Sequence, residues 1–216
     1  MLKPSLLLIL LILFIPIALS GYSPVLREIH EQLRQDESFS LSFQQTTYTA
    51  ALNRKTNSQG KLSYLFPNLS RWDYTTPDEQ SIIINSNELQ FIDPVLETFT
   101  IKKIQRAERN SALTFLSGSK DLYKDFEEID EGSENFVECE NKTLFVQPKD
   151  KEDIIKEIHI CYDGSHHFEK ISVLETNGNY RLFQFSDLNK TDKDYTKFQF
   201  KMPQGWELIK ESTLPN

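Results

Sequence analysis

Glycine and basic residues are both scarce in this chain. Its 216 residues include 7 Gly, and none of them lies in a G-x-G-x-x-G run or a complete Walker loop, which argues against a nucleotide-binding enzyme. Lys and Arg number 24 against 32 Asp and Glu, so the net charge is −8, and no basic stripe is present. An acidic surface repels phosphate, and the composition therefore disfavours a nucleic-acid partner.

Long apolar runs are also missing, except at the N-terminus. There, a run from Leu6 to Leu19 follows Lys3, and small residues precede Gly21. The run is shorter than the roughly 20 residues that a helix needs to span a bilayer, so an integral membrane protein is disfavoured. We expect residues 1–20 to be a cleaved secretory signal peptide and residues 21–216 to form one exported domain.

Cysteine is rare, with only Cys139 and Cys161 in the sequence. Export places both in an oxidising compartment. If the strands predicted at 136–147 and 154–163 form a hairpin, one register puts Cys139 opposite Tyr162. A shift of one residue would then bring the two sulfurs into bonding range. We expect a disulfide between Cys139 and Cys161.

Hydrophobic periodicity predicts a mainly β chain. Residues 23–37 are expected to form a helix, with Ser23 as N-cap and Pro24 in the first turn. A second helix is expected over 105–118, and the acidic stretch 120–134 is compatible with a short helix or a loop. Alternating apolar residues predict about eleven strands, in one antiparallel sheet large enough to curl, at 38–43, 60–66, 71–74, 80–85, 88–92, 95–102, 136–147, 154–163, 168–175, 179–186 and 194–202.

Signatures of catalysis and metal binding are weak. The sequence has no G-x-S-x-G and no H-E-x-x-H motif. His159 would share a strand face with Cys161, and the pair His166 and His167 follows nearby, but bridged thiols and histidines in solvent are the simpler interpretation. The paired acids at 127–128 lie in an acidic run that is typical of a solvated face. We expect no enzymatic activity, no metal and no cofactor.

Aromatic residues are abundant by contrast, with 15 Phe, 8 Tyr and 2 Trp. On the predicted strands most of them fall on alternate positions, so they gather on one face of the sheet. That face could be an ordinary core packed by the two helices. It could also be a concave surface that binds an apolar ligand, and periodicity alone does not choose between the two.

Several motifs in residues 43–101 do bear on that choice. They are Phe43-Gln44-Gln45, Gly60-x-Leu62, Pro67-Asn68-Leu69-x-x-Trp72-x-Tyr74, Pro77-x-Glu79-Gln80 and Leu89-x-Phe91-x-Asp93-Pro94. In order and spacing these motifs resemble the outer-membrane lipoprotein carrier protein family, LolA. Further along, residues 111–116 resemble the family's lid helix, and Phe198-x-Phe200-x-x-Pro203-x-Gly205 resembles its closing strand.

The resemblance implies a fold and a function. The fold is an unclosed antiparallel β-barrel of about eleven strands, with helices forming a lid over a hydrophobic cavity. The function is that of a monomeric periplasmic chaperone, which takes acylated lipoproteins from an inner-membrane ABC transporter and passes them to an outer-membrane receptor. A carrier or sensor of free lipid or glycolipid is the main alternative. A secreted hydrolase and a structural β protein are remote ones.

The resemblance also implies which side chains would contact the acyl chains. Plain core packing is the alternative for each of them, because a small barrel fills itself with the same residue types. One of them, Phe66, stands where the family commonly has an Arg that latches the lid, so we expect lid closure here to depend on apolar contact. The expected lining consists of Phe43, Leu62, Tyr64, Phe66, Trp72, Tyr74, Leu89, Phe91, Leu96 and Phe99, with Leu113, Phe115 and Leu116 from the lid.

Overall fold

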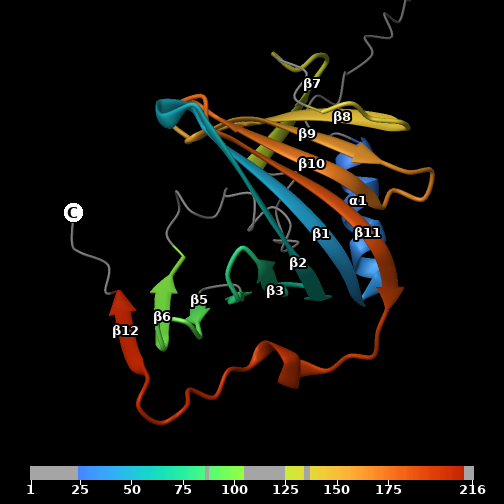
Figure 1. Ribbon diagram of the computed structural model, residues 1–216. Coiled ribbons are helices and arrows are strands. Elements are labelled where there is room, and N and C mark those ends of the chain that lie inside the picture. Colours follow the sequence, from blue (N-terminus) through green and yellow to red (C-terminus); the bar gives the residue numbers. More distant parts are fainter. Residues whose placement is uncertain (1–23, 86–87, 105–124, 134–136, 212–216) are drawn as a thin grey trace, which may run out of the picture.

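A computed structural model describes residues 24–85, 88–104, 125–133 and 137–211 (Figure 1). The described part begins with helix α1, Pro24–Asp36, which turns Leu26, Ile29 and Leu33 into the protein. These residues recur every three or four positions, as an amphipathic helix requires. No helix in this part of the chain has the length and apolar character needed to cross a membrane. The proposed N-cap Ser23 lies outside the described residues.

The remaining described elements are twelve strands and two short 3-10 helices. The 3-10 helices are η1, Ala50–Leu52, and η3, Tyr195–Phe198. The strands are β1 Ser38–Thr49, β2 Arg54–Leu65, β3 Leu69–Thr76, β4 Gln80–Ile84, β5 Glu88–Asp93, β6 Thr98–Lys103, β7 Phe126–Ile129, β8 Lys142–Pro148, β9 Ile155–Tyr162, β10 Phe168–Glu175, β11 Tyr180–Lys190 and β12 Glu207–Glu211.

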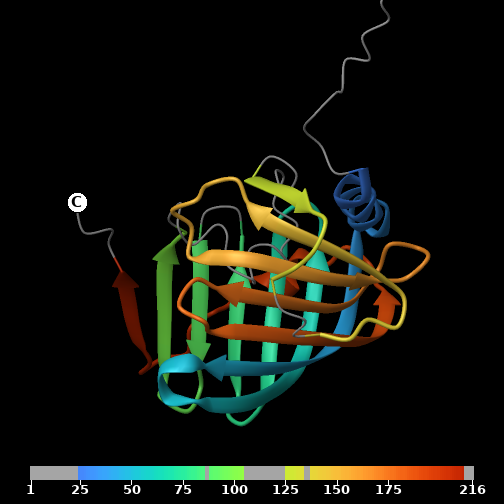
Figure 2. The ribbon, with the colours of Figure 1, turned by 90° about the horizontal axis from the view of Figure 1, so that it is seen from above.

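All twelve strands form a single sheet in the order β12-β6-β5-β4-β3-β2-β1-β11-β10-β9-β8-β7. Neighbours are antiparallel except β12 and β6, which are parallel. The sheet folds over on itself, so that β8–β11 lie across β3–β6 when the molecule is seen from above (Figure 2). Its ends, β12 and β7, are not paired with each other. The predicted fold class, a mainly β unclosed barrel, is confirmed.

The sequence-based assignment of strands needs correction at several places. The stretch predicted as a strand at 194–202 contains η3 instead, where the Asp194 side chain accepts a hydrogen bond from the Thr196 backbone N–H. Its alternating Phe198 and Phe200 pack onto the sheet from outside and belong to no strand. The acidic stretch 120–134 contains strand β7, and β12 was not predicted. The described part of the chain therefore has twelve strands, where periodicity predicted about eleven for the whole.

Each face of the sheet carries its own hydrophobic cluster. The inner cluster fills the space between the two folded halves and includes the buried residues of α1. The outer cluster lies on the opposite face of β2–β6 and is covered by the chain between β11 and β12. Its members are Leu65, Ile83, Ile92, Phe99 and Phe198, with Leu69, Ile101, Phe200, Met202 and Trp206 packed against them.

Residues 130–133 and 137–141, called the strap below, are attached to the outer face of β8–β10. Cys139 and Cys161 form a disulfide with their Cα atoms 5.4 Å apart. The register behind the predicted bridge is wrong, because Cys161 of β9 lies opposite Thr143. Cys139 precedes β8 and reaches Cys161 from an irregular segment, which a strand register does not constrain.

Buried Glu157 holds the other end of the strap. Its carboxylate accepts hydrogen bonds from the Ser133 backbone N–H at 3.0 Å and the Ser133 hydroxyl at 2.8 Å, and it pairs with His159 Nε2 at 2.9 Å. Gly132 fits only without a side chain, since a Cβ there would lie 2.6 Å from His159 Nε2. Burial acts to raise the pKa of Glu157, but the hydrogen bonds from Ser133 and His159 outweigh it and hold that pKa below its ordinary value.

We predict that Glu157→Gln destabilises the protein at pH 7 by about 1–3 kcal/mol, because Ser133 and His159 lose their charged acceptor. A carboxylate with a lowered folded-state pKa contributes stability above its unfolded pKa, and this contribution disappears as the pH falls through the folded value. The gap between wild type and variant should therefore shrink in acid below about pH 4.3. Urea unfolding from pH 7 to pH 3 measures it. Exposed Glu152→Gln is the control, and a gap that does not change with pH would contradict the assignment.

Candidate functional site

The centre of the inner face is a cluster of aromatic rings from strands that are distant in sequence. The Phe43 ring of β1 lies 5.1 Å from Trp72 and 5.0 Å from Tyr74, both of β3, in edge-to-face contacts. Phe183 of β11 lies 5.5 Å from Trp72. Alternation along each strand turns these residues inward, and the fold of the sheet brings them together. The result is an almost wholly apolar interior.

Most of the expected lining residues lie on this inner face. Four of them are fully buried in the inner cluster, namely Phe43, Leu62, Tyr64 and Trp72. Four others are half-buried and pack against the same cluster, namely Phe66, Tyr74, Leu89 and Phe91. Leu113, Phe115 and Leu116 lie outside the described residues.

Two expected lining residues are elsewhere. Leu96 is 69% exposed in a turn, because the Asp93 side chain accepts the backbone N–H groups of Val95 and Leu96 and delays the next strand. That strand, β6, begins at Thr98 and turns Phe99 to the outer face, where its ring lies 4.9 Å from Phe200. Placing both residues on the inner face is therefore wrong, since the predicted strand began too early.

Other residues of the inner face were not predicted to belong to the lining. Phe39 and Leu41 share the face of Phe43 in β1. The alternation that places them there is visible in the sequence, but they were not assigned to the lining. The signals for the others were the alternating stretches 154–163, 168–175 and 179–186, but how these strands pair with β1–β6 was unknown. The missed residues include Phe39, Leu41, Ile158, Ile160, Phe168, Ile171, Val173, Phe183 and Phe185.

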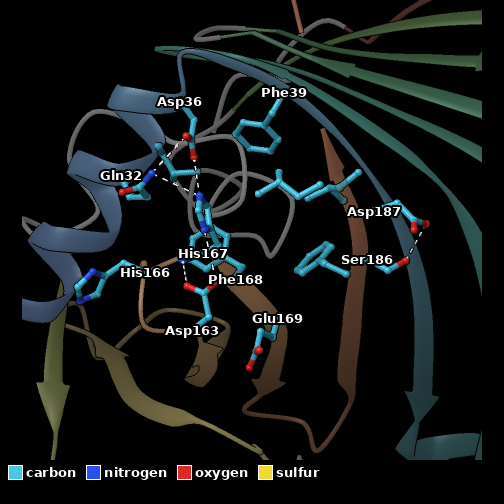
Figure 3. A pocket seen from close by; sticks show the side chains of 14 residues that line it. Gln32, Asp36, Phe39, Asp163, His166, His167, Phe168, Glu169, Ser186 and Asp187 are labelled. Carbon is cyan, nitrogen blue, oxygen red and sulfur yellow. Dashed lines mark hydrogen bonds and ion pairs between the residues drawn. The ribbon is translucent and has the colours of Figure 1, made fainter. Parts of the chain in front are cut away.

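A small cavity opens at one end of the inner face, between α1, β1, β11 and the β9–β10 loop (Figure 3). Its volume is about 180 Å³, less than the roughly 300–1,000 Å³ of typical ligand pockets. Its apolar wall includes Leu33, Phe39, Leu41, Phe168, Phe185 and Leu188, and its acidic rim includes Asp36, Asp163, Glu169 and Asp187. The described side chains thus leave only a small space at this end of the inner face.

The opening of this cavity is called the mouth below. Ion pairs at the mouth attach α1 to the sheet. Asp36, whose side chain is 2% exposed, pairs with His167 Nε2 at 3.0 Å and with Lys190 Nζ at 3.0 Å. His166 Nε2 lies 3.0 Å from Glu28 Oε2 on the same helix. The expectation that these two histidines lie free in solvent is wrong, because the β9–β10 loop turns both toward α1 (Figure 3).

The β9–β10 loop is itself organised around Asp163. The Asp163 side chain accepts the backbone N–H groups of Ser165 at 2.8 Å and His167 at 2.9 Å. Partial burial acts to raise the pKa of Asp163, but these two N–H groups and the nearby His167 hold it below its ordinary value. A carboxylate that stays ionised keeps the loop closed and its histidines in place.

Phe66 directly follows β2 and contacts α1, at the position where the resemblance implied a latching Arg. Its ring lies 6.1 Å from the His30 ring in an edge-to-face arrangement, and its backbone N–H donates to the Glu37 carbonyl. Arg71 is turned away to the outer face, where it binds Asp73 and the Lys197 carbonyl. An apolar contact therefore occupies the expected position of the latch.

Nothing at the described residues suggests a metal centre. No group of three or more His, Cys, Asp and Glu side chains is arranged there to hold an ion. His159 faces Glu157 beneath the strap, away from the His166 and His167 pair. Glu127 is exposed and accepts hydrogen bonds from Gln147 and Lys151, which fits a solvated acidic face.

Comparisons with known proteins agree with this arrangement. The family described as Outer membrane lipoprotein carrier protein LolA matches residues 34–201. An outer-membrane lipoprotein carrier protein from Actinobacillus succinogenes is 28% identical over 180 residues, which is 83% of each chain. One from Aeromonas salmonicida is 26% identical over 182 residues, covering 83% of this chain and 86% of the relative.

Solved structures are similar to this chain at much lower identity. An uncharacterized conserved protein from Thermus thermophilus covers 86% of this chain and 98% of its own, with a TM-score of 0.50 and 10% identity. A LolA superfamily protein from Nitrosomonas europaea aligns with a TM-score of 0.48 and 12% identity, over 82% of this chain and 96% of its own. The family match covers well over half of the sequence. The chain belongs to the LolA family of outer-membrane lipoprotein carrier proteins, and its general role is that of a lipoprotein carrier.

We predict that Asp36→Asn loosens α1, because His167 and Lys190 lose a buried charged partner. Hydrogen bonds to charged groups contribute about 1.5–3 kcal/mol each, so a loss in that range is expected in chemical unfolding, with faster hydrogen exchange in α1. Glu31→Gln is the control, since Glu31 pairs with Arg34 on the exposed side of the same helix and should cost less than about 1 kcal/mol. Equal effects of the two variants would refute a special role for Asp36.

Proposed function

We propose that the protein is a periplasmic chaperone that binds the acyl chains of lipoproteins against its inner face and carries them from the inner to the outer membrane. Residues 1–20 would direct its export and be removed. It would receive lipoproteins from the inner-membrane releasing transporter and deliver them to an outer-membrane receptor. Membership of the LolA family and the aromatic inner face that reaches the cavity support this proposal.

The physical need for such a carrier follows from its cargo. Each methylene group transferred from lipid contributes about 0.8 kcal/mol to membrane affinity, so several acyl chains do not leave a membrane unaided. A continuous surface of Phe, Tyr and Trp replaces lipid for chains of different length, because it offers apolar area without a closely shaped pocket. The cluster around Phe43, Trp72 and Phe183 supplies that surface.

Loading would require the interior to open. A cavity of about 180 Å³ is too small for several acyl chains, so side chains that now fill the interior must separate. Helix α1 is the element best placed to move, since it covers the mouth and is attached there through Asp36, Glu28 and the contact with Phe66. The sheet, with its continuous hydrogen bonding, would remain in place.

Release of lipoproteins from spheroplasts tests the proposal directly. The purified mature protein is added to spheroplasts that retain an outer-membrane lipoprotein, and the supernatant is examined for a soluble complex. Release of the lipoprotein is the expected result. Recovery of free lipid or glycolipid without lipoprotein would favour the alternative carrier, and no release of either kind would overturn the proposal.

We predict that Leu188→Glu lowers lipoprotein release about tenfold, which corresponds to a loss of about 1.4 kcal/mol in binding. Leu188 is 40% exposed and lines the cavity beside an acidic rim, so a further carboxylate there would oppose entry of an acyl chain. Leu52→Glu is the matched control, because Leu52 is 64% exposed in η1 and does not line the cavity. Similar release by the two variants would show that the mouth is not the route of entry.

A further inference from the structure

Three polar side chains are buried in the inner face with no hydrogen-bond partner for their polar atoms among the described residues. They are Tyr64 through its hydroxyl, Ser70 through its hydroxyl and Trp72 through its indole N–H. All three residues are completely inaccessible to solvent. Among the described residues these atoms meet no acceptor, although nearly all buried polar groups in proteins are paired.

The three groups lie together on two neighbouring strands. Ser70 of β3 is directly opposite Tyr64 of β2, and Trp72 follows Ser70 by two positions and so shares its face. Opposite and diagonal neighbours of this kind are within about 8 Å of each other. The three residues are therefore neighbours on the inner face, among side chains that are otherwise apolar.

The patch lies next to the cavity. The Phe39 ring lines the cavity and is stacked on the Tyr64 ring, with the centroids 4.8 Å apart. Tyr64 is thus one aromatic layer behind the cavity wall to which Phe39 belongs. A ligand that enters at the mouth and displaces the Phe39 ring would reach Tyr64 first.

Tyr74, on the same face, shows how a tyrosine hydroxyl is ordinarily paired within a protein. The Tyr74 hydroxyl donates to Gln45 Oε1 at 2.8 Å, so its donor is already used within the protein. Burial raises the pKa of Tyr64 strongly, which keeps its hydroxyl protonated and able to donate. If the inner face served only to bind hydrocarbon, phenylalanine at position 64 would avoid leaving a donor unpaired.

We propose that Tyr64, Ser70 and Trp72 form a subsite for the carbonyl oxygens of acyl ester and amide groups. An indole N–H can only donate, so the ligand atom must be an acceptor. The residues of the inner cluster are uncharged, and an anion such as phosphate would be buried there without a counter-charge. A neutral carbonyl oxygen meets both conditions. The proposal rests on the proposed function. It adds that the carrier recognises the ester or amide groups of the acyl chains as well as their hydrocarbon.

Ester and ether lipids of equal chain length separate the two kinds of recognition. A diacylglycerol and the corresponding dialkyl glycerol ether are each used to displace the apolar dye ANS from the mature protein. The ester should bind about tenfold more tightly, as expected for one or two hydrogen bonds in an apolar site. Tyr64→Phe and Trp72→Phe should each lower this ester-to-ether ratio. Tyr74→Phe is the matched control for the ratio, because it removes a hydroxyl that is already paired.

The two tryptophans of the chain provide a second readout that needs no variant. With the indole nitrogens labelled by ¹⁵N, the Trp72 N–H resonance should shift when the ester lipid binds and much less with the ether lipid. Trp206, which packs in the outer cluster, should not distinguish the two lipids. A Trp72 resonance that responds equally to ester and ether would overturn the subsite, even if the substituted proteins fail to fold.

A lipopeptide with a diacylglyceryl cysteine, tested beside free diacylglycerol, identifies the source of the carbonyl. An ester preference with both, or with the lipopeptide alone, supports the subsite and separates lipoprotein from free lipid. Equal binding of esters and ethers, unchanged by Tyr64→Phe and Trp72→Phe, would overturn the subsite and leave the carrier proposal standing. If neither lipid displaces the dye, the proposed function fails together with the subsite.

Discussion

Covering an aromatic inner face without closing the sheet is the constraint on which the rest of this structure depends. In a closed barrel the strands themselves seal the interior, but here β7 and β12 end the sheet unpaired with each other. The mouth is instead covered by α1, which contributes Leu26, Ile29 and Leu33 to the inner cluster. A helix held by side chains can separate from a sheet at far lower cost than a hydrogen-bonded strand, and a carrier needs that difference.

The two faces of the sheet are stabilised in different ways. On the outer face the strap is held by a disulfide and by buried Glu157, and the chain after β11 covers the outer cluster. At the mouth, α1 is attached by ion pairs of Asp36 and Glu28 and by the contact of Phe66 with His30. Stability is therefore concentrated away from the element that would have to move. A firm outer face would keep the sheet in shape while its interior opens.

Much of the fold and part of the site could be predicted from the sequence, because both depend on local alternation. Phe43, Leu62, Trp72 and their neighbours were assigned to the correct face, since a period of two decides the face once a strand is recognised. The predicted positions of Leu96 and Phe99 were wrong because the turn at Asp93 delays the start of β6. Phe198 and Phe200 alternate without forming a strand, since an irregular chain packed on a sheet also turns every second residue inward.

The sequence by itself determined the class of the protein, the alternation of its faces and its membership of a carrier family, because these depend on residue type and spacing. Only the tertiary structure decided which side chains from distant strands meet. It paired His166 and His167 with α1, left Tyr64, Ser70 and Trp72 without acceptors among the described residues, and placed Cys139 outside its expected register. Contacts of this kind depend on how the sheet folds over itself, and no local pattern in the sequence encodes how the two halves of the sheet face each other.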